Sequence, residues 1–385
     1  MAGKDYIQDY IKYFSVQTGG APRQEKLEWA IRETLSEQDL KLFFMMPFSG
    51  SIKPEKLARK AARAGFTEDA FQECLQGLHE EGFAISYDDP KKGRVYERAF
   101  VSFTVEQQVR RRKGTEIGAA YGEFWDGLAE LTTSMPSKTP YFRVVPVEQT
   151  VTGQEGSRTI AVGETIEDTR AVLPIDIISE MVRKEPLIAV SECYCRLAKD
   201  NRGDEEPCTY PRETCFTFNE LAQTLIETGL AREVDADEAV RILKNAEEHG
   251  LVHNADNCQG HLKALCNCCP CCCPAIKSYK MGVRNVNAAS RYLAVLNEVL
   301  CTNCGTCVEV CPVDAISDGQ DFPEFMSEKC IGCGLCVSNC PEEAIGMELR
   351  ADLPKIPRDN DALWSRIRNE AVVTMVKEKV FGSKN

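Results

Sequence analysis

Eight of the chain's 20 cysteines lie in two runs, and their spacing is that of metal ligands. The runs are residues 301–312 and 330–341, and each reads C-x2-C-x2-C-x3-C-P. A cubane iron–sulfur cluster needs four thiolates that converge on four iron atoms. Two-residue spacings let a tight loop direct three sulfurs and several backbone N–H groups at one cubane, and the proline ends that loop. Zinc ligation and disulfides are the competing interpretations, and the duplicated run disfavours both.

The second run repeats the first at an offset of 29 residues, and both close as Cys-Pro-x-x-Ala-Ile. This pattern closely resembles the two-cluster, bacterial-type 2[4Fe-4S] ferredoxins. The resemblance implies that the fourth cysteine of each run ligates the other cluster. It assigns to the first cluster Cys301, Cys304, Cys307 and Cys340. It assigns to the second cluster Cys330, Cys333, Cys336 and Cys311.

Four cysteines further upstream form a candidate third site: Cys193, Cys195, Cys208 and Cys215. Four thiols suffice for one cubane or for one tetrahedral zinc ion, and both interpretations stay open beside unligated cysteines. The loop between the second and third of them is polar and contains Gly and Pro, as a site-forming loop should. Arg196 either tunes this site with an N–H donor and a positive charge or is a surface residue.

Residues 266–274 are denser still in thiols, and read CNCCPCCCP. A single cubane cannot use all of these thiols: Cys266, Cys268, Cys269, Cys271, Cys272 and Cys273. The spacing of Cys266, Cys269 and Cys272 repeats that of the ferredoxin loops, with Cys258 as a candidate remote fourth ligand. A further cubane, a larger non-cubane cluster, a zinc site and a substrate-facing thiol centre all fit this pattern. Adjacent free thiols would repel and oxidise, which favours metal binding.

The net charge of −13 argues against general affinity for nucleic acid or anionic membranes. Residues 298–350 carry ten acidic and two basic side chains. Acidic surroundings favour the oxidised form of a cluster and steer the module towards a protein redox partner with a basic docking surface. An ordinary solvated face is the alternative interpretation of this charge.

We expect neither a cleaved leader nor a membrane span. Lys4 is followed by Asp5 and Tyr6 rather than by an apolar segment, and no apolar run reaches 18 residues. A cysteine-rich chain without such signals is expected to bind metal rather than to form disulfides. The expected location is the reducing cytoplasm of an anaerobe, because several clusters in one chain are sensitive to oxygen.

The elements before the cysteines predict an N-terminal domain that resembles a winged helix-turn-helix. The first of three helices is expected to end before Pro47, the second at Gly65 and the third at Gly82, and two strands follow at 83–87 and 94–100. The third helix carries acidic residues and no Lys or Arg, so phosphate would repel it and DNA binding is disfavoured. Docking or dimerisation, in a homo- or hetero-oligomer, is the preferred role of this domain.

The fold class expected is a multi-domain α+β protein with a C-terminal ferredoxin-like module. The expected parts are a winged-helix-like domain with an N-terminal arm (1–115), a central α/β Cys-rich metal-binding domain (116–290), the 2[4Fe-4S] domain (291–350), and a linker with an amphipathic helix (351–385). In the central part, β-branched residues favour extended structure at 141–147 and 159–162. More weakly, residues 173–276 resemble large ferredoxin-domain iron–sulfur proteins of strict anaerobes.

These observations favour an iron–sulfur electron-transfer protein, or an electron-transferring subunit of an anaerobic oxidoreductase complex. Single electrons would pass through two [4Fe-4S] clusters and one or two further iron–sulfur or zinc sites. No Gly-x-Gly-x-x-Gly or P-loop motif supports a nucleotide or flavin site in this chain. The alternatives are a redox-sensing transcriptional regulator that uses the winged helix, and a reductase with its chemistry at the cysteines of 266–273. A component of an oxidoreductase is preferred over a stand-alone enzyme.

Overall fold

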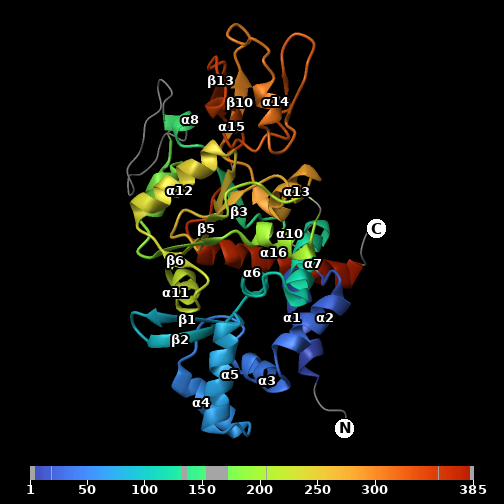
Figure 1. Ribbon diagram of the computed structural model, residues 1–385, viewed down its shortest axis with the longest axis vertical. Coiled ribbons are helices and arrows are strands. Elements are labelled where there is room, and N and C mark those ends of the chain that lie inside the picture. Colours follow the sequence, from blue (N-terminus) through green and yellow to red (C-terminus); the bar gives the residue numbers. More distant parts are fainter. Residues whose placement is uncertain are drawn as a thin grey trace. The chain divides into compact units, whose positions relative to one another are not determined.

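A computed structural model describes residues 5–18, 20–131, 137–152, 172–204, 206–353 and 355–381, and it mixes helices with sheets, as an α+β protein does (Figure 1). The chain divides into two compact units. The first comprises Met1–Ser134, Ala189–Glu213 and Thr217–Glu233, and the second comprises Met135–Ile188, Thr214–Phe216 and Val234–Asn385. The four domains expected from the sequence are smaller than these two units, and that division stays a prediction.

The first unit is mostly helical. Its helices are α1 (Tyr6–Thr18), α2 (Gln24–Thr34), α3 (Glu37–Met45), α4 (Pro54–Arg63), α5 (Glu68–Glu80), α6 (Val101–Arg111), α7 (Glu116–Leu131), α10 (Tyr194–Arg202) and α11 (Asn219–Glu227). Its hairpin is β1 (Ala84–Asp89) with β2 (Gly93–Arg98), which pair antiparallel. Strand β4 (Ile188–Glu192) pairs antiparallel with β6 (Arg232–Glu233) through residues of this unit.

Local signals set the helix boundaries around the hairpin. Ser36 and Asp39 form a capping box at the start of α3, and the Thr67 hydroxyl accepts a hydrogen bond from the Ala70 N–H at the start of α5. Gly82 follows α5 with φ of 76°, a left-handed conformation that glycine adopts without strain. Three helices and a hairpin therefore occur in the order expected, with Ile52 bridged to Tyr96 of β2.

In the second unit, a sheet runs in the order β8-β7-β3-β9. Strand β7 (Val252–Asp256) lies antiparallel to both β3 (Phe142–Val145) and β8 (Ala264–Cys268), while β9 (Asn287–Ala288) lies parallel to β3. Strand β5 (Glu213–Phe218) contributes residues to both units. The stretch at 141–147 thus contains a strand, whereas 159–162 lies outside the described residues.

The remaining elements of the second unit lie outside this sheet, and those from β10 to β13 belong to the C-terminal module. They are α8 (Gln149–Thr152), the 3-10 turn η2 (Pro174–Asp176), α9 (Ile178–Arg183), α12 (Ala236–Glu248), α13 (Pro274–Lys280), β10 (Tyr292–Leu296), α14 (Thr306–Glu309), β11 (Ile316–Ser317), β12 (Glu324–Phe325), α15 (Leu335–Ser338), β13 (Ile345–Leu349) and α16 (Asn360–Phe381). Strand β10 pairs antiparallel with β13, so the module's first and last strands meet (Figure 1).

The C-terminal helix α16 packs onto its own unit. Its Leu363 is fully buried, and Trp364 stacks on Tyr141 with ring centroids 6.3 Å apart. The Glu370 carboxylate accepts hydrogen bonds from the Ser137 hydroxyl at 2.9 Å and from the Thr139 hydroxyl at 2.8 Å. These contacts tie the helix to the segment that leads into β3.

Among the described residues, no helix is both long and apolar enough to cross a membrane.

Candidate metal centres

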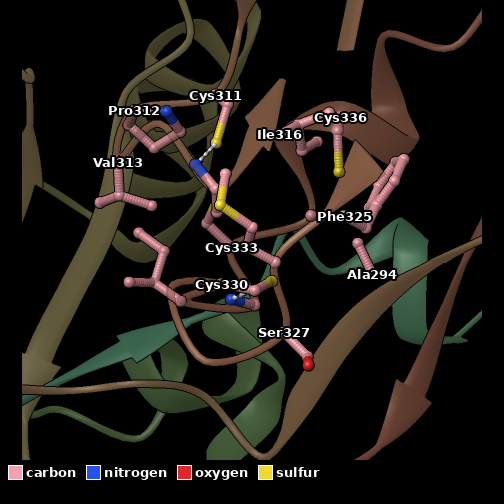
Figure 2. A pocket seen from close by; sticks show the side chains of 15 residues that line it. Ala294, Cys311, Pro312, Val313, Ile316, Phe325, Ser327, Cys330, Cys333 and Cys336 are labelled. Carbon is pink, nitrogen blue, oxygen red and sulfur yellow. Dashed lines mark hydrogen bonds between the residues drawn. The ribbon is translucent and has the colours of Figure 1, made fainter. Parts of the chain in front are cut away.

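The two cysteine runs enclose two separate hollows, and each hollow combines thiols from both runs. The first is lined by Cys301, Cys304, Cys307 and Cys340. The second is lined by Cys311, Cys330, Cys333 and Cys336, and Figure 2 shows all four of these side chains around it. Four thiols per hollow, with the fourth from the other run, is the donor set that the sequence predicts for two cubanes.

The 29-residue repeat extends to the backbone conformation of the loops. Asn303 and Gly332 both have positive φ, at 55° and 64°, and so do Gly305 and Gly334, at 80° and 82°. The last pair directly precedes α14 and α15. Left-handed residues at these places turn the chain sharply between successive cysteines. Each loop therefore brings three of its sulfurs to one side.

Backbone N–H groups point at the sulfurs in the same repeated pattern. The N–H of Ala315 donates to the Cys311 sulfur at 3.2 Å, and its counterpart Ala344 donates to the Cys340 sulfur at 3.3 Å. The Cys330 sulfur likewise accepts from the Gly332 N–H at 3.4 Å. Such bonds favour the negative charge of a thiolate and of any cluster that it holds. The loops thus fit [4Fe-4S] clusters in donor type, donor number and surrounding dipoles.

The two hollows differ in their exposure to solvent. Cys304 of the first hollow is exposed, and hydrogen bonds from Thr306 lower the pKa of its thiol. Cys333 and Cys336 of the second hollow are buried, and burial raises the pKa of Cys333 to about 12. The first hollow therefore reaches the surface at Cys304, whereas the second contains two buried cysteines beside the half-buried Cys311 and Cys330.

The loop of the second hollow is also fixed from outside the repeat. The Ser290 hydroxyl donates to the Gly332 carbonyl oxygen at 2.7 Å, and the Val147 N–H donates to the Cys333 carbonyl oxygen at 2.9 Å. Arg350 donates from its guanidinium to the Cys330 carbonyl oxygen at 2.6 Å. Sequence reasoning missed these three supporting residues, because only the fold brings them to the loop.

The four upstream cysteines are distributed between the two units. Cys193, Cys195 and Cys208 belong to the first unit and Cys215 to the second, and all four are buried. Cys193 directly precedes α10, and the Cys195 sulfur accepts a hydrogen bond from the Trp125 indole N–H at 3.3 Å. Arg196 is fully buried and donates to the Pro211 carbonyl oxygen at 2.6 Å, so it is not a surface residue. That these cysteines share one cluster stays a prediction.

The cysteines of 266–273 separate into two groups. Cys266 and Cys268 lie on β8, and Cys273 caps α13. The Cys266 thiol is hydrogen-bonded to both Cys215 and Cys268, and the Cys273 and Cys268 sulfurs are 3.1 Å apart. A second group contains Cys269, Cys271 and Cys272, whose sulfurs all lie within 4.8 Å of one another.

Cys258 has charged neighbours instead. Burial, with the charge of Asp256 next in importance, raises the pKa of its thiol to about 11, while Arg143 and Lys184 oppose this shift. The structure provides no reason to add this cysteine to either thiol group.

Comparisons with known proteins bear on the C-terminal module alone. Residues 293–341 match the family model described as a 4Fe-4S dicluster domain. Neither a curated protein nor a solved structure matches the chain. The chain therefore contains a ferredoxin-type iron–sulfur domain.

Proposed function

We propose that this chain is the electron-transferring component of an anaerobic oxidoreductase, and that it passes single electrons through two [4Fe-4S] clusters. When bound, such a cluster takes up or releases one electron. Cys301, Cys304, Cys307 and Cys340 would hold the first cluster, and Cys311, Cys330, Cys333 and Cys336 the second. The observation that carries the proposal is the pairing of two four-thiol hollows in a single module, one of which has an exposed cysteine, Cys304, while the other has none.

The exposed hollow is the proposed docking side. Val299 is 93 % exposed and Leu300 is 49 % exposed, directly before the first cysteine of the run. Two adjacent exposed apolar side chains in an acidic module suit a partner with a basic rim and an apolar centre. The acidic charge would speed association with such a partner and would orient it. The partner would therefore exchange electrons with the first cluster, at the surface.

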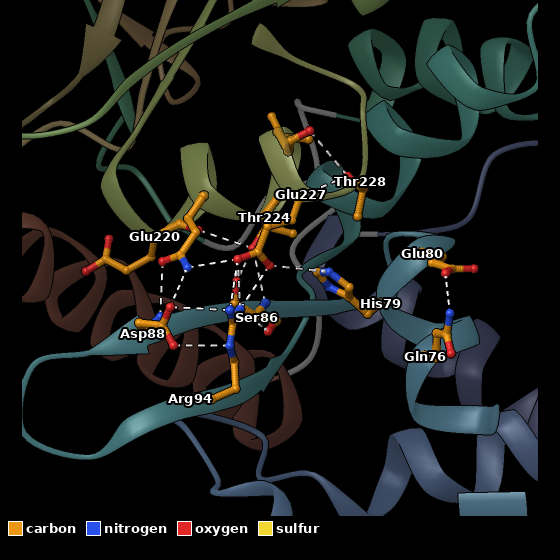
Figure 3. A network of polar contacts seen from close by, with 12 residues as sticks. Gln76, His79, Glu80, Ser86, Asp88, Arg94, Glu220, Thr224, Glu227 and Thr228 are labelled. Atoms are coloured by element: carbon orange, nitrogen blue, oxygen red, sulfur yellow. Dashed lines mark hydrogen bonds and ion pairs between the residues drawn. The ribbon is translucent and has the colours of Figure 1, made fainter. Parts of the chain in front are cut away.

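A DNA-reading role has less support, because the hairpin that would act as the wing is held by the chain's own α11 (Figure 3). The Ser86 N–H donates to the Thr224 hydroxyl at 3.1 Å, and that hydroxyl donates to the Ser86 carbonyl oxygen at 2.8 Å. Arg94 of β2 pairs with Glu227 at 2.9 Å. A cation already paired with a carboxylate contributes little to phosphate binding.

Anaerobic purification followed by electron-transfer kinetics tests this proposal. We expect about eight iron atoms and eight sulfides in the module, with two reducible EPR signals. The dithionite-reduced protein should reduce a basic c-type cytochrome faster at low salt than at high salt, whereas reduction of a neutral small-molecule acceptor should be insensitive to salt. Absence of reducible clusters, or transfer to the cytochrome that does not depend on salt, would refute the proposal.

A further inference from the structure

Four cysteines of the second unit converge outside the ferredoxin module, and we refer to Cys215, Cys266, Cys268 and Cys273 as the inner thiol group. They come from β5, from β8 and from the residue that caps α13. Hydrogen bonds join the sulfurs of Cys215 to Cys266 and of Cys266 to Cys268, and the sulfurs of Cys268 and Cys273 are 3.1 Å apart. Cys266 is half-buried and the other three are buried.

This arrangement suits a metal centre better than it suits a disulfide or isolated thiols. The separation of 3.1 Å between the Cys268 and Cys273 sulfurs exceeds the roughly 2.05 Å of a disulfide bond. Four convergent thiols in one buried place are the ligand set of iron–sulfur clusters or of zinc. Metal binding releases the thiol protons, so the four adjacent sulfurs no longer compete as S–H donors in one small volume.

A buried amide beside the group is directed at one of its thiols. Asn254 of β7 is 1 % exposed, and a hydrogen bond from its side chain lowers the pKa of the Cys268 thiol. Its amide group has no other hydrogen-bond partner among the described residues. A buried amide with so few partners is costly, so one is expected where a ligand completes the site. An amide N–H directed at a metal-bound thiolate would fill that role.

The inner thiol group and the second ferredoxin hollow share one apolar core. Cys268, Cys273 and Cys333 are members of the same buried cluster, together with Val313 and Ile331. Cys266, Cys311 and Cys330 pack against the same cluster from its margin. Apolar side chains of one cluster therefore pack against both sets of sulfurs. The apolar surroundings of an iron–sulfur centre lower the local dielectric constant and help to set its potential.

We propose that the inner thiol group holds a third iron–sulfur centre, which exchanges single electrons with the cluster of the second ferredoxin hollow. One electron would leave the reduced cluster and enter the third centre, and no bond or proton need change partners. The inference rests on the proposed function, because it needs a cluster in the second hollow. It also differs from the grouping by sequence, which places Cys215 with Cys193, Cys195 and Cys208.

The test compares Cys215→Ala and Cys268→Ala in the full chain, purified anaerobically, with Cys74→Ala as a matched control. Cys74 is a buried cysteine of α5, in the other unit. Iron, acid-labile sulfide and zinc are measured per chain, and reduced-state EPR follows the ferredoxin signals. We expect each of the first two variants to lose the same centre, on the order of four irons. Both should keep the ferredoxin signals but lose the broadening that a nearby third paramagnet imposes on one of them.

Several results would overturn the inference. They are unchanged iron in both variants, loss of zinc in place of iron, and loss of iron in one variant alone. The ferredoxin signals show that each variant has folded, and the two substitutions lie on different strands, so one misfolded variant leaves the other informative. Absence of both ferredoxin signals in the unaltered chain would instead refute the proposed function, which separates the two failures.

Discussion

The guanidinium of Arg350 donates a hydrogen bond to the carbonyl oxygen of Cys330 at 2.6 Å, which ties the residue after β13 to the first cysteine of the second run. The same guanidinium donates from Nε to the Ser290 carbonyl oxygen at 3.0 Å. A positive charge fixed at this place favours the extra negative charge of a reduced cluster in the second hollow.

Replacing Arg350 by Gln should therefore lower the midpoint potential of the second cluster and leave that of the first nearly unchanged. A tenfold change in a one-electron equilibrium is about 59 mV, and we expect about half of that. An EPR-monitored redox titration measures both clusters. Arg358→Gln is the control, because Arg358 is 84 % exposed at its side chain and pairs with the neighbouring Asp359. Equal shifts in both clusters would contradict the prediction.

Each hollow takes its fourth thiol from the other cysteine run, and this crossed lining gives a second prediction. Cys340→Ala should abolish the surface cluster, and Cys311→Ala should abolish the buried one, each with the loss of about four irons. A soluble paramagnetic relaxation agent shows which cluster remains in each variant, because Cys304 at the first hollow is exposed. The remaining EPR signal should respond more strongly to the agent in Cys311→Ala than in Cys340→Ala. Ligation without crossing would reverse these responses.

The exposed side chain beside the first hollow gives a third prediction. Val299→Ser should slow electron transfer to the basic cytochrome about fivefold, or ~1 kcal/mol, because a central apolar contact is lost. The cluster itself should keep its iron and its potential. Val373→Ser serves as the control, since Val373 is 52 % exposed on α16. An equal loss of rate in both variants would show that the effect is not one of docking.

The stability of the first unit should depend on pH through Glu106 of α6. Burial raises the pKa of Glu106 from 4.5 to about 7, against the opposing charge of Arg110 at 3.4 Å. The folded state then binds the proton more tightly than the unfolded state between these two values. Stability is therefore greatest below pH 4.5 and falls as pH rises through 7, by up to about 3 kcal/mol.

Glu106→Gln should remove this pH dependence, because glutamine stays neutral throughout. Thermal unfolding of the first unit, followed from pH 5.5 to pH 8, measures it. The unaltered protein should lose thermal stability across that range, and the variant should lose much less. Parallel curves for the two proteins would mean that Glu106 is already ionised in the folded state.

The ferredoxin loops were predictable because their chemistry is local. The cysteine spacing fixes which sulfurs share a loop, and the 29-residue offset between Asn303 and Gly332 is repeated in their backbone angles. The boundaries of α5 were predictable for the same reason, since Thr67 and Gly82 are signals within the helix's own sequence. In both cases, residues that are close together in the sequence determine the local structure.

The inner thiol group could not be found in this way. Cys215 meets Cys266 because their strands are brought together, and the Asn267 side chain between the two cysteines of β8 donates to the Thr214 carbonyl oxygen at 2.7 Å. Spacing alone favours grouping Cys215 with cysteines close to it in the chain. The hydrogen bond between Thr224 and Ser86 also joins residues that are far apart in sequence, and no motif in the hairpin predicts it.

The crossed lining has a consequence for biogenesis. A nascent chain that ends before Cys330 presents three of the thiols of the first hollow and only one of the second. Strand β10 also lacks its partner until residues 345–349 have been made. The second site has all four thiols only once Cys336 has been made, and the first only once Cys340 has been made. Neither cluster can therefore be inserted with its full set of ligands before the second run has been synthesised.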